Sequence, residues 1–194
     1  MSEQKKAIVF LADGTEEMEF TISAVDVLRR AKVDVTVVGV QLEKDYAVCS
    51  RGVKVLPDAK FEDINIDASQ YDLVLIPGGA GGAKTLAAHE GIQKLIFDFY
   101  NKKKFVAFVC AGTLVAKAAG IPYKHKVTSY PGAVKEQLVS LYNYSDDRVV
   151  VDDNVITSRG PGTTFLFALT IVEQLVDAKT SEALREEMLT SADL

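Results

Sequence analysis

The stretch FVAFVCAGT (residues 105–113) places five apolar residues directly before a cysteine and two small residues. A short run that is apolar at every position is typical of a strand buried on both faces of a parallel sheet. Cys110 therefore follows a buried strand, and Ala111 and Gly112 leave room for a tight bend into the next helix. This order of strand, nucleophile and helix matches a nucleophile elbow, although an inert buried cysteine at a strand end is the structural alternative.

Outward from this stretch, short apolar runs alternate with longer amphipathic segments. The other expected strands are KAIVFLA (6–12), VDVTVVGV (33–40), YDLVLI (71–76) and short ones near 126–129, 148–152 and 155–158. The expected helices cover 16–31, 83–89, 92–103, 112–119, 133–141, 162–177 and 180–190, with a small hairpin and a connection in 41–66. The alternation predicts an α/β fold, a doubly wound and mostly parallel sheet with helices on both faces. No linker divides the chain, so we expect a single domain over residues 1–194.

Composition and charge narrow the class of protein. The chain has 48% hydrophobic and 25% charged residues, as globular proteins do, and its net charge of −5 leaves no electrostatic footprint for nucleic acid. The apolar stretch 7–12 is too short for a signal-peptide core or a membrane span. We therefore expect no nucleic-acid or membrane partner and a location in the cytoplasm, with the nucleus as a second location.

Cysteine and histidine usage argues against disulfides and metal. Cys49 and Cys110 cannot make a disulfide framework, so we expect two thiols, with Cys49 as a strand residue. His89 and His125 lie at no metal-ligand spacing and are not expected to be catalytic. We expect neither a metal nor another cofactor.

Three segments are expected to meet beyond the carboxyl ends of the parallel strands, where reactive groups of such sheets collect. They are residues 13–19, 77–82 and 110–113. At the start of a helix, the dipole and free N–H groups stabilise a thiolate, so we expect a lowered pKa for Cys110.

Two glycines follow Pro77 at the end of an expected strand. The N–H groups of Gly78 and Gly79, with that of Ala111, could form an oxyanion hole beside the sulfur, or these glycines could only permit a sharp turn. The segment GGAGGAKT (78–85) nearly matches a phosphate loop, but Ala83 stands where the second glycine is required, which disfavours nucleotide binding.

The acidic segment DGTEEME (13–19) would repel phosphate. Glu16 and Glu17 are expected only to compensate the helix N-terminus. Glu19 has a different role if it points toward the region beyond the carboxyl ends of the strands, where Cys110 is expected. There a carboxyl with a raised pKa could share a proton with Cys110.

Five motifs occur in order along the chain: LADGTEEMEF, IPGGAGG, FVCAGT, VTSYPG and ITSRGPGT. With them the chain resembles the ThiJ/PfpI superfamily, in the branch of the Parkinsonism-associated deglycase. The resemblance implies a flavodoxin-like fold, a homodimer, and a reactive cysteine at a strained elbow that is hydrogen-bonded to a protonated glutamate. These roles carry over to Cys110 and Glu19, and the oxyanion donors to Gly79 and Ala111 with Gly78 adjacent.

Two positions depart from the family pattern. Tyr130 stands where many members have histidine, and a phenol is a poor base at neutral pH. Tyr130 is either a substrate contact or a packing residue at a dimer-facing loop. Thr113 stands where many relatives have proline, and this replacement of proline is expected to loosen the turn after the nucleophile.

Arg159 lies in a segment that the family places near the interface and active site, and is a secondary candidate.

The resemblance implies a glutathione-independent glyoxalase and deglycase, a glyoxalase III-type lyase. Such an enzyme converts methylglyoxal and related 2-oxoaldehydes to 2-hydroxy acids through a cysteine hemithioacetal. The alternative is an oxidative-stress sensor or protective protein that acts through oxidation of Cys110 to sulfinate. A glutaminase needs a His-x-Glu pair after its nucleophile, and the peptidases of the superfamily need a histidine at position 111, where this chain has alanine.

Overall fold

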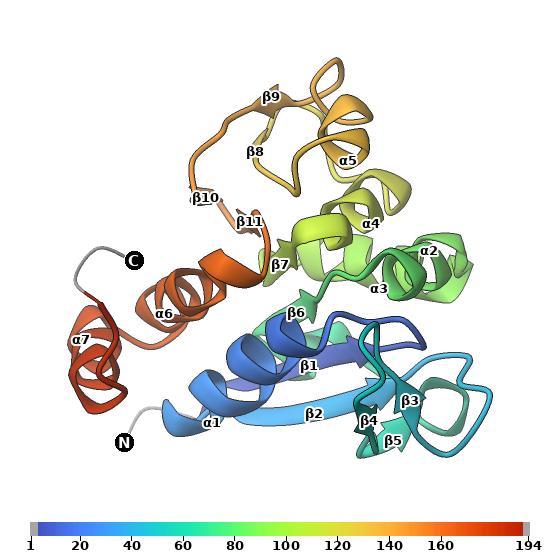
Figure 1. Cartoon of the computed structure of the whole chain (residues 1–194), viewed down its shortest axis with the longest axis horizontal. Coiled ribbons are helices and arrows are strands. Elements are labelled where there is room, and N and C mark those ends of the chain that lie inside the picture. Colours follow the sequence, from blue (N-terminus) through green and yellow to red (C-terminus); the bar gives the residue numbers. More distant parts are fainter. Residues whose placement is uncertain (1–3, 192–194) are drawn as a thin grey trace.

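A central seven-stranded sheet organises the computed structural model, which describes residues 4–191 (Figure 1). In order across the sheet, the strands are β10 (Val149–Asp152), β11 (Val155–Ser158), β7 (Phe105–Val109), β6 (Leu73–Ile76), β1 (Lys6–Leu11), β2 (Asp34–Gly39) and β5 (Ala59–Lys60). All neighbours in this sheet run parallel except β10, which is antiparallel to β11. The fold is therefore the expected mostly parallel α/β sheet.

The helices lie on the two faces of this sheet. They are η1 (Glu19–Val27) with α1 (Leu28–Arg30), α2 (Ala80–Ala88), α3 (Glu90–Asn101), α4 (Thr113–Ala118), α6 (Thr164–Leu175) and α7 (Ala178–Glu187). From β1 the chain crosses to β2 on one side, whereas from β6 it crosses to β7 on the other. Because parallel crossovers are right-handed, these opposite directions place η1–α1 and α2–α3 on opposite faces. The border between β1 and β6 is the switch point at which such folds carry their sites.

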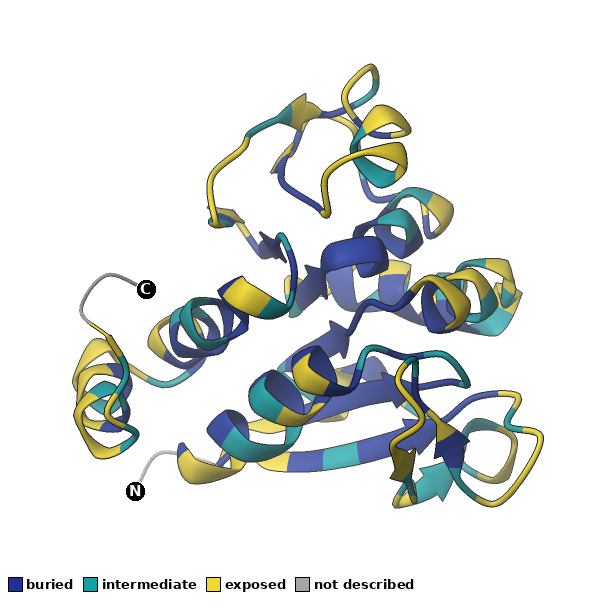
Figure 2. Cartoon of the chain, viewed as in Figure 1, coloured by how far each residue is buried: buried dark blue, intermediate teal, exposed yellow. Residues whose placement is uncertain are grey.

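The core forms around strands that are buried on both faces (Figure 2). β1, β6 and β7 are almost wholly buried, as their uninterrupted apolar sequences predict. Phe10, Phe108 and Phe167 are among the largest fully buried side chains, and each contributes about 1.5–3 kcal/mol by leaving water. This burial on both faces agrees with the doubly wound, flavodoxin-like strand order of the sheet.

The first helix differs from its expected form. The spacing of Met18, Ile22, Val25 and Leu28 favours an ordinary amphipathic helix, but Met18 is 51% exposed and only the last of the four is buried. The structure has a π-helix over Glu19–Val27, and its buried residues are Glu19, Phe20, Ser23, Ala24 and Val27. Its i→i+5 bonding widens the turn, so residues four apart share the inner face. This shift turns Glu19 toward the sheet.

Several boundaries also differ from the expected ones. α2 begins at Ala80 rather than 83, because Gly79 takes φ 88° and turns the chain directly into the helix. α5 (Ala133–Glu136) ends before 141. The expected hairpin is present as β3 (Ala47–Val48) and β4 (Lys54–Val55), but β5 was not expected.

A small layer outside the main sheet carries the segment that follows α4. It contains β8 (Lys126–Val127), α5 and β9 (Asn143–Tyr144), with a separate apolar cluster of Val127, Leu138 and Tyr142. Residues 1–3 and 192–194 lie outside the described residues, so the domain limits of 1 and 194 stay predictions. No helix within 4–191 is long and apolar enough to cross a bilayer.

Candidate active site

Cys110 lies at a tight backbone turn directly after β7. Its φ of 61° is in the left-handed region, which is unfavourable for a residue with a side chain and is found most often at functional sites. The next residues form a single 3₁₀ turn, η4 (Cys110–Gly112), that leads into α4. A Cβ on Gly112 would lie 2.7 Å from the carbonyl oxygen of Ile76, so only glycine fits there. Cys110 is 8% exposed, so little of this residue is open to solvent.

Glu19 brings a fully buried carboxyl group to this turn. Its Oε2 accepts a hydrogen bond of 2.8 Å from the N–H of Gly78, and its carboxyl is hydrogen-bonded to the Cys110 side chain. Its Oε1 has no hydrogen-bond partner within residues 4–191. The Glu19 N–H donates to Oε2 of Glu16 at 2.8 Å, which holds the start of the helix. The structure thus brings together the two residues expected to react.

The pKa of Glu19 is raised from 4.5 to about 7, mainly because burial disfavours the charged form. The hydrogen bonds from Cys110 and Gly78 oppose this rise, whereas the charge of Glu16 adds to it. A carboxyl with this pKa can both accept and return a proton near neutral pH.

The pKa of the Cys110 thiol is raised to about 12, so the expected lowering at a helix start is wrong. Burial is the largest cause, and the Glu19 charge and hydrogen bond add to it. The N–H groups of Ala111 and Gly79 lower the value, as predicted, but do not outweigh burial. Below about pH 12 the pair therefore holds at most one negative charge, which appears as pH rises through about 7, and Cys110 forms a thiolate by passing its proton to Glu19 rather than to solvent.

The three expected oxyanion donors divide between two roles. The N–H groups of Gly79 and Ala111 face the Cys110 sulfur, whereas the N–H of Gly78 is engaged by Glu19. Gly79 has φ 88°, and a Cβ there would lie 2.5 Å from the backbone nitrogen of Glu16. The two glycines thus serve both the turn and the site, because the N–H of Gly79 faces the sulfur and that of Gly78 binds Glu19.

The Tyr130 side chain lies next to this site and takes no part in its hydrogen bonds, whereas the backbone of this residue does. Its N–H donates to the Cys110 carbonyl oxygen at 3.4 Å, and its ring packs over Gly160. The side chain is 47% exposed, and its hydroxyl has no hydrogen-bond partner among the described residues. A depression of about 250 Å³ that includes Tyr130, Arg148 and Arg159 adjoins it.

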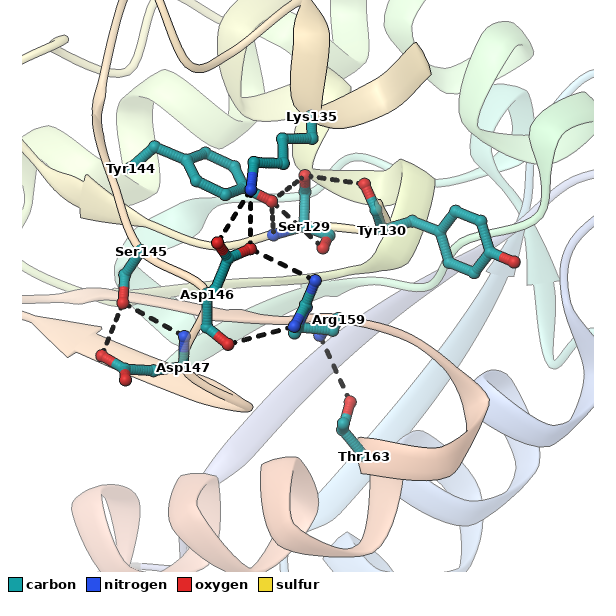
Figure 3. A network of polar contacts seen from close by, with 9 residues as sticks. All are labelled: Ser129, Tyr130, Lys135, Tyr144, Ser145, Asp146, Asp147, Arg159 and Thr163. Carbon is teal, nitrogen blue, oxygen red and sulfur yellow. Dashed lines mark hydrogen bonds and ion pairs between the residues drawn. The ribbon is translucent and has the colours of Figure 1, made fainter. Parts of the chain in front are cut away.

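A charge network holds the layer that carries Tyr130 (Figure 3). Asp146 pairs with Lys135 at 2.8 Å and with Arg159 at 3.3 Å, while the Tyr130 ring points away from these groups. The guanidinium of Arg159 is therefore engaged by Asp146. The role of Asp146 could not be predicted from the sequence, because ion pairs between distant segments leave no local pattern.

Thr113 lies in the turn after the nucleophile, and the expected loosening relative to proline stays a prediction. Its hydroxyl donates a buried hydrogen bond of 3.1 Å to the carbonyl oxygen of Thr128, which ties the nucleophile turn to the layer that carries Tyr130. Both residues belong to the motifs FVCAGT and VTSYPG, but nothing in the sequence predicts that these two segments meet through this hydrogen bond. The hydroxyl stabilises the turn in a way that proline cannot.

The remaining cysteine and the histidines lie elsewhere. Cys49 directly follows β3, and burial raises the pKa of its thiol to about 11. The ring of His89 accepts a hydrogen bond from Ile92 at the start of α3, and His125 is buried between Tyr100 and Asp152. No cluster of three metal-ligating side chains occurs within residues 4–191.

The chain as a whole is similar to known proteins of one family. The model of the DJ-1/PfpI family matches residues 5–174. The Parkinson disease protein 7 homolog of Danio rerio is 44% identical over 186 residues, which cover 95% of this chain and 97% of that protein. The glutathione-independent glyoxalase DJ-1 of Schizosaccharomyces pombe is 39% identical, with coverage of 88% and 91%. The crystal structure of Drosophila melanogaster DJ-1beta superimposes with a TM-score of 0.90 at 40% identity, covering 97% of this chain and all of that one.

Proposed function

This chain belongs to the DJ-1/PfpI family, and on that basis we propose that it is a glutathione-independent glyoxalase and deglycase. Its substrates would be methylglyoxal, related 2-oxoaldehydes and their early adducts with amines and thiols. The name of the Schizosaccharomyces pombe relative supports this activity. The observation that carries the proposal is the buried Glu19 carboxyl, hydrogen-bonded to both Cys110 and Gly78.

In the first step, the Cys110 sulfur attacks the aldehyde carbon of the substrate. The thiol proton passes to Glu19, whose pKa of about 7 suits a general base near neutral pH. The N–H groups of Gly79 and Ala111 face the sulfur and can stabilise the oxygen that gains negative charge. Protonation of that oxygen by Glu19 gives a hemithioacetal, so no proton is left over.

In the second step, Glu19 moves a proton between two substrate carbons. It removes the hydrogen of the hemithioacetal carbon to form an enediol, and a proton returns to the neighbouring carbon. The product is a thioester of Cys110, which water hydrolyses to the 2-hydroxy acid and the free thiol. The overall reaction adds one water to methylglyoxal and gives lactate. No step uses a base at position 130.

A second candidate role rests on the Glu19 oxygen that lacks a partner. Hydrogen peroxide would oxidise the Cys110 thiolate to sulfenate and, with a second equivalent, to sulfinate, releasing water each time. Protonated Glu19 and the N–H groups of Gly79 and Ala111 could bind the added oxygens. Mass spectrometry after peroxide treatment tests this role, and a sulfonate as the first stable product would contradict it.

We also propose a homodimer, formed through an exposed apolar surface. Met18, Val48, Val53 and Leu56 expose apolar side chains that would form it. Glu17, the neighbour of Met18, links that segment to the β3–β4 hairpin, because its carboxylate accepts hydrogen bonds from Ser50 and Arg51 in the hairpin loop. Sedimentation at micromolar concentration should give a dimer, and a monomer would refute the proposal. Location in the cytoplasm or nucleus stays a prediction.

The function is tested by incubating reduced protein with methylglyoxal without glutathione and measuring lactate. Many turnovers are expected, with their loss in Cys110→Ser. Cys49→Ser is the matched control, since Cys49 is also a buried thiol but lies outside the site. Lactate at the same rate in Cys110→Ser would overturn the proposal.

A further inference from the structure

A groove of about 590 Å³ lies between α2 and α4, beside the small outer layer. Its volume is within the range of about 300–1,000 Å³ that small-molecule sites occupy. Although Ala111 reaches its wall, the groove contains neither Cys110 nor Glu19. The reaction proposed above therefore does not account for it.

The floor of the groove is hollow because its helices present short side chains. Six alanines line it: Ala80, Ala83, Ala87, Ala88, Ala111 and Ala118. Leu114 and Val134 add apolar surface. One wall is Tyr123, which is 48% exposed and packs edge-to-face against Tyr142 with 5.0 Å between ring centroids. The Tyr142 hydroxyl donates to the carbonyl oxygen of Ile121 at 2.9 Å, so this wall is held in place.

Charge distinguishes the groove from an ordinary apolar depression. Lys84 and Lys117 line it, and no acidic residue does. Neither lysine has an ion-pair partner within residues 4–191, in contrast to Lys103, Lys126 and Lys135, which all pair with aspartates. The whole chain carries a net charge of −5, so two unpaired cations beside an apolar floor form a local site for an anion.

We propose that this groove binds a small amphiphilic carboxylate. The apolar body of the ligand lies on the alanine floor, and its carboxylate faces Lys84 and Lys117. The limited volume favours a free small molecule over a peptide helix, because a helix with its side chains is about 10–12 Å across. The apolar floor supplies the affinity and the two lysines select the anionic head.

Octanoate is a suitable probe, and 1-octanol is its neutral counterpart. Isothermal titration should show one octanoate site per chain. Lys84→Gln and Lys117→Gln should each weaken octanoate about two- to fivefold, as expected for exposed ion pairs, without changing 1-octanol. Ala118→Phe places a large side chain in the groove and should abolish the binding of both probes. Lys179→Gln, on α7 and outside the groove, is the matched control and should change nothing.

The outcomes separate this site from the proposed enzyme. Cys110→Ser should retain octanoate binding, because the groove does not need the thiol. Equal octanoate affinity in the Lys84→Gln/Lys117→Gln double variant and the unaltered protein would overturn the proposal. So would binding that survives Ala118→Phe, or an acidic amphipathic peptide that binds the groove when millimolar octanoate does not. The lysine variants decide the question even if Ala118→Phe fails to fold.

Discussion

The N–H group of Gly78 lies 2.8 Å from Oε2 of Glu19, although 59 residues separate them in the chain. This hydrogen bond joins the loop after β6 to the helix after β1, on the two sides of the switch point of the sheet. The third part of the site, Cys110, comes from β7, the next strand across. The reactive pair therefore depends on the spacing of three parallel strands rather than on one local motif.

Gly78→Ala should damage the site directly. An added Cβ would lie 2.6 Å from the Cys110 Cβ and would also meet the Glu19 carboxylate. Overpacking of this kind costs about 1–3 kcal/mol, and we expect lactate formation to fall more than tenfold. Gly162→Ala is the matched control, because a Cβ there has no heavy atom within 4 Å. Urea unfolding and lactate assays check both, and equal effects of the two substitutions would contradict this account.

Enzyme activity should rise with pH as the Cys110–Glu19 pair loses its first proton. The pKa of Glu19 is about 7 and that of Cys110 about 12, so kcat/KM should increase through about pH 7 and stay level to at least pH 9. Glu19→Gln removes the proton acceptor and should remove this rise together with most activity. A profile of kcat/KM between pH 5 and 9 measures it. An unchanged rise in Glu19→Gln would show that another group titrates.

Glu19 should also make the folded protein less stable as pH rises. In the unfolded chain it ionises near its ordinary pKa of 4.5, whereas in the folded protein it ionises near 7. Between these values the folded state holds a proton that the unfolded state has released, so the free energy of unfolding falls with increasing pH. The full effect, reached above pH 7, is about 3 kcal/mol.

Glu19→Gln should therefore be more stable than the unaltered protein at pH 8 and about equally stable at pH 4.5. Thermal unfolding at both values measures this difference. The neutral amide keeps an oxygen for the Gly78 N–H and carries no charge to bury. A lower Tm for Glu19→Gln at pH 8 would mean that the carboxylate is better compensated than burial alone suggests.

The parts of the fold with uninterrupted apolar sequence could be predicted. Strands such as β1 and β7 are buried on both faces, so composition alone identifies them. The inward direction of Glu19 could not be derived from helical spacing, because the wide turns of the π-helix move a different set of residues inside. Family resemblance, rather than periodicity, indicated this carboxyl.

The electrostatics of the site were the least predictable part. A helix start predicts a lowered thiol pKa, but how deeply Cys110 is buried and how near a second negative charge lies are properties of the folded chain. The same holds for Thr113, whose partner Thr128 is distant in sequence. Local patterns identify which residues can react, whereas their protonation depends on tertiary packing.

Tyr130→Phe should leave activity within about twofold. The Tyr130 hydroxyl has no partner among the described residues and is not a neutral-pH base, so its loss removes no interaction of the pair. The phenyl ring keeps the packing over Gly160. Lactate formation under saturating methylglyoxal checks this prediction. A drop of more than tenfold in kcat would instead assign the hydroxyl a contact with the substrate.

Thr113→Val should weaken both the fold and the site. Valine has nearly the shape of threonine but cannot donate to the buried carbonyl oxygen of Thr128, and an unsatisfied buried acceptor costs about 1–3 kcal/mol. Because this hydrogen bond ties the turn that carries Cys110 to the layer that carries Tyr130, we also expect a lower kcat. Thr113→Ser keeps the donor and loses only a methyl group, so it should retain more stability and most activity. Urea unfolding with lactate kinetics on both variants measures the difference, and a Val variant as active and stable as the Ser variant would show that the hydroxyl does not position the nucleophile.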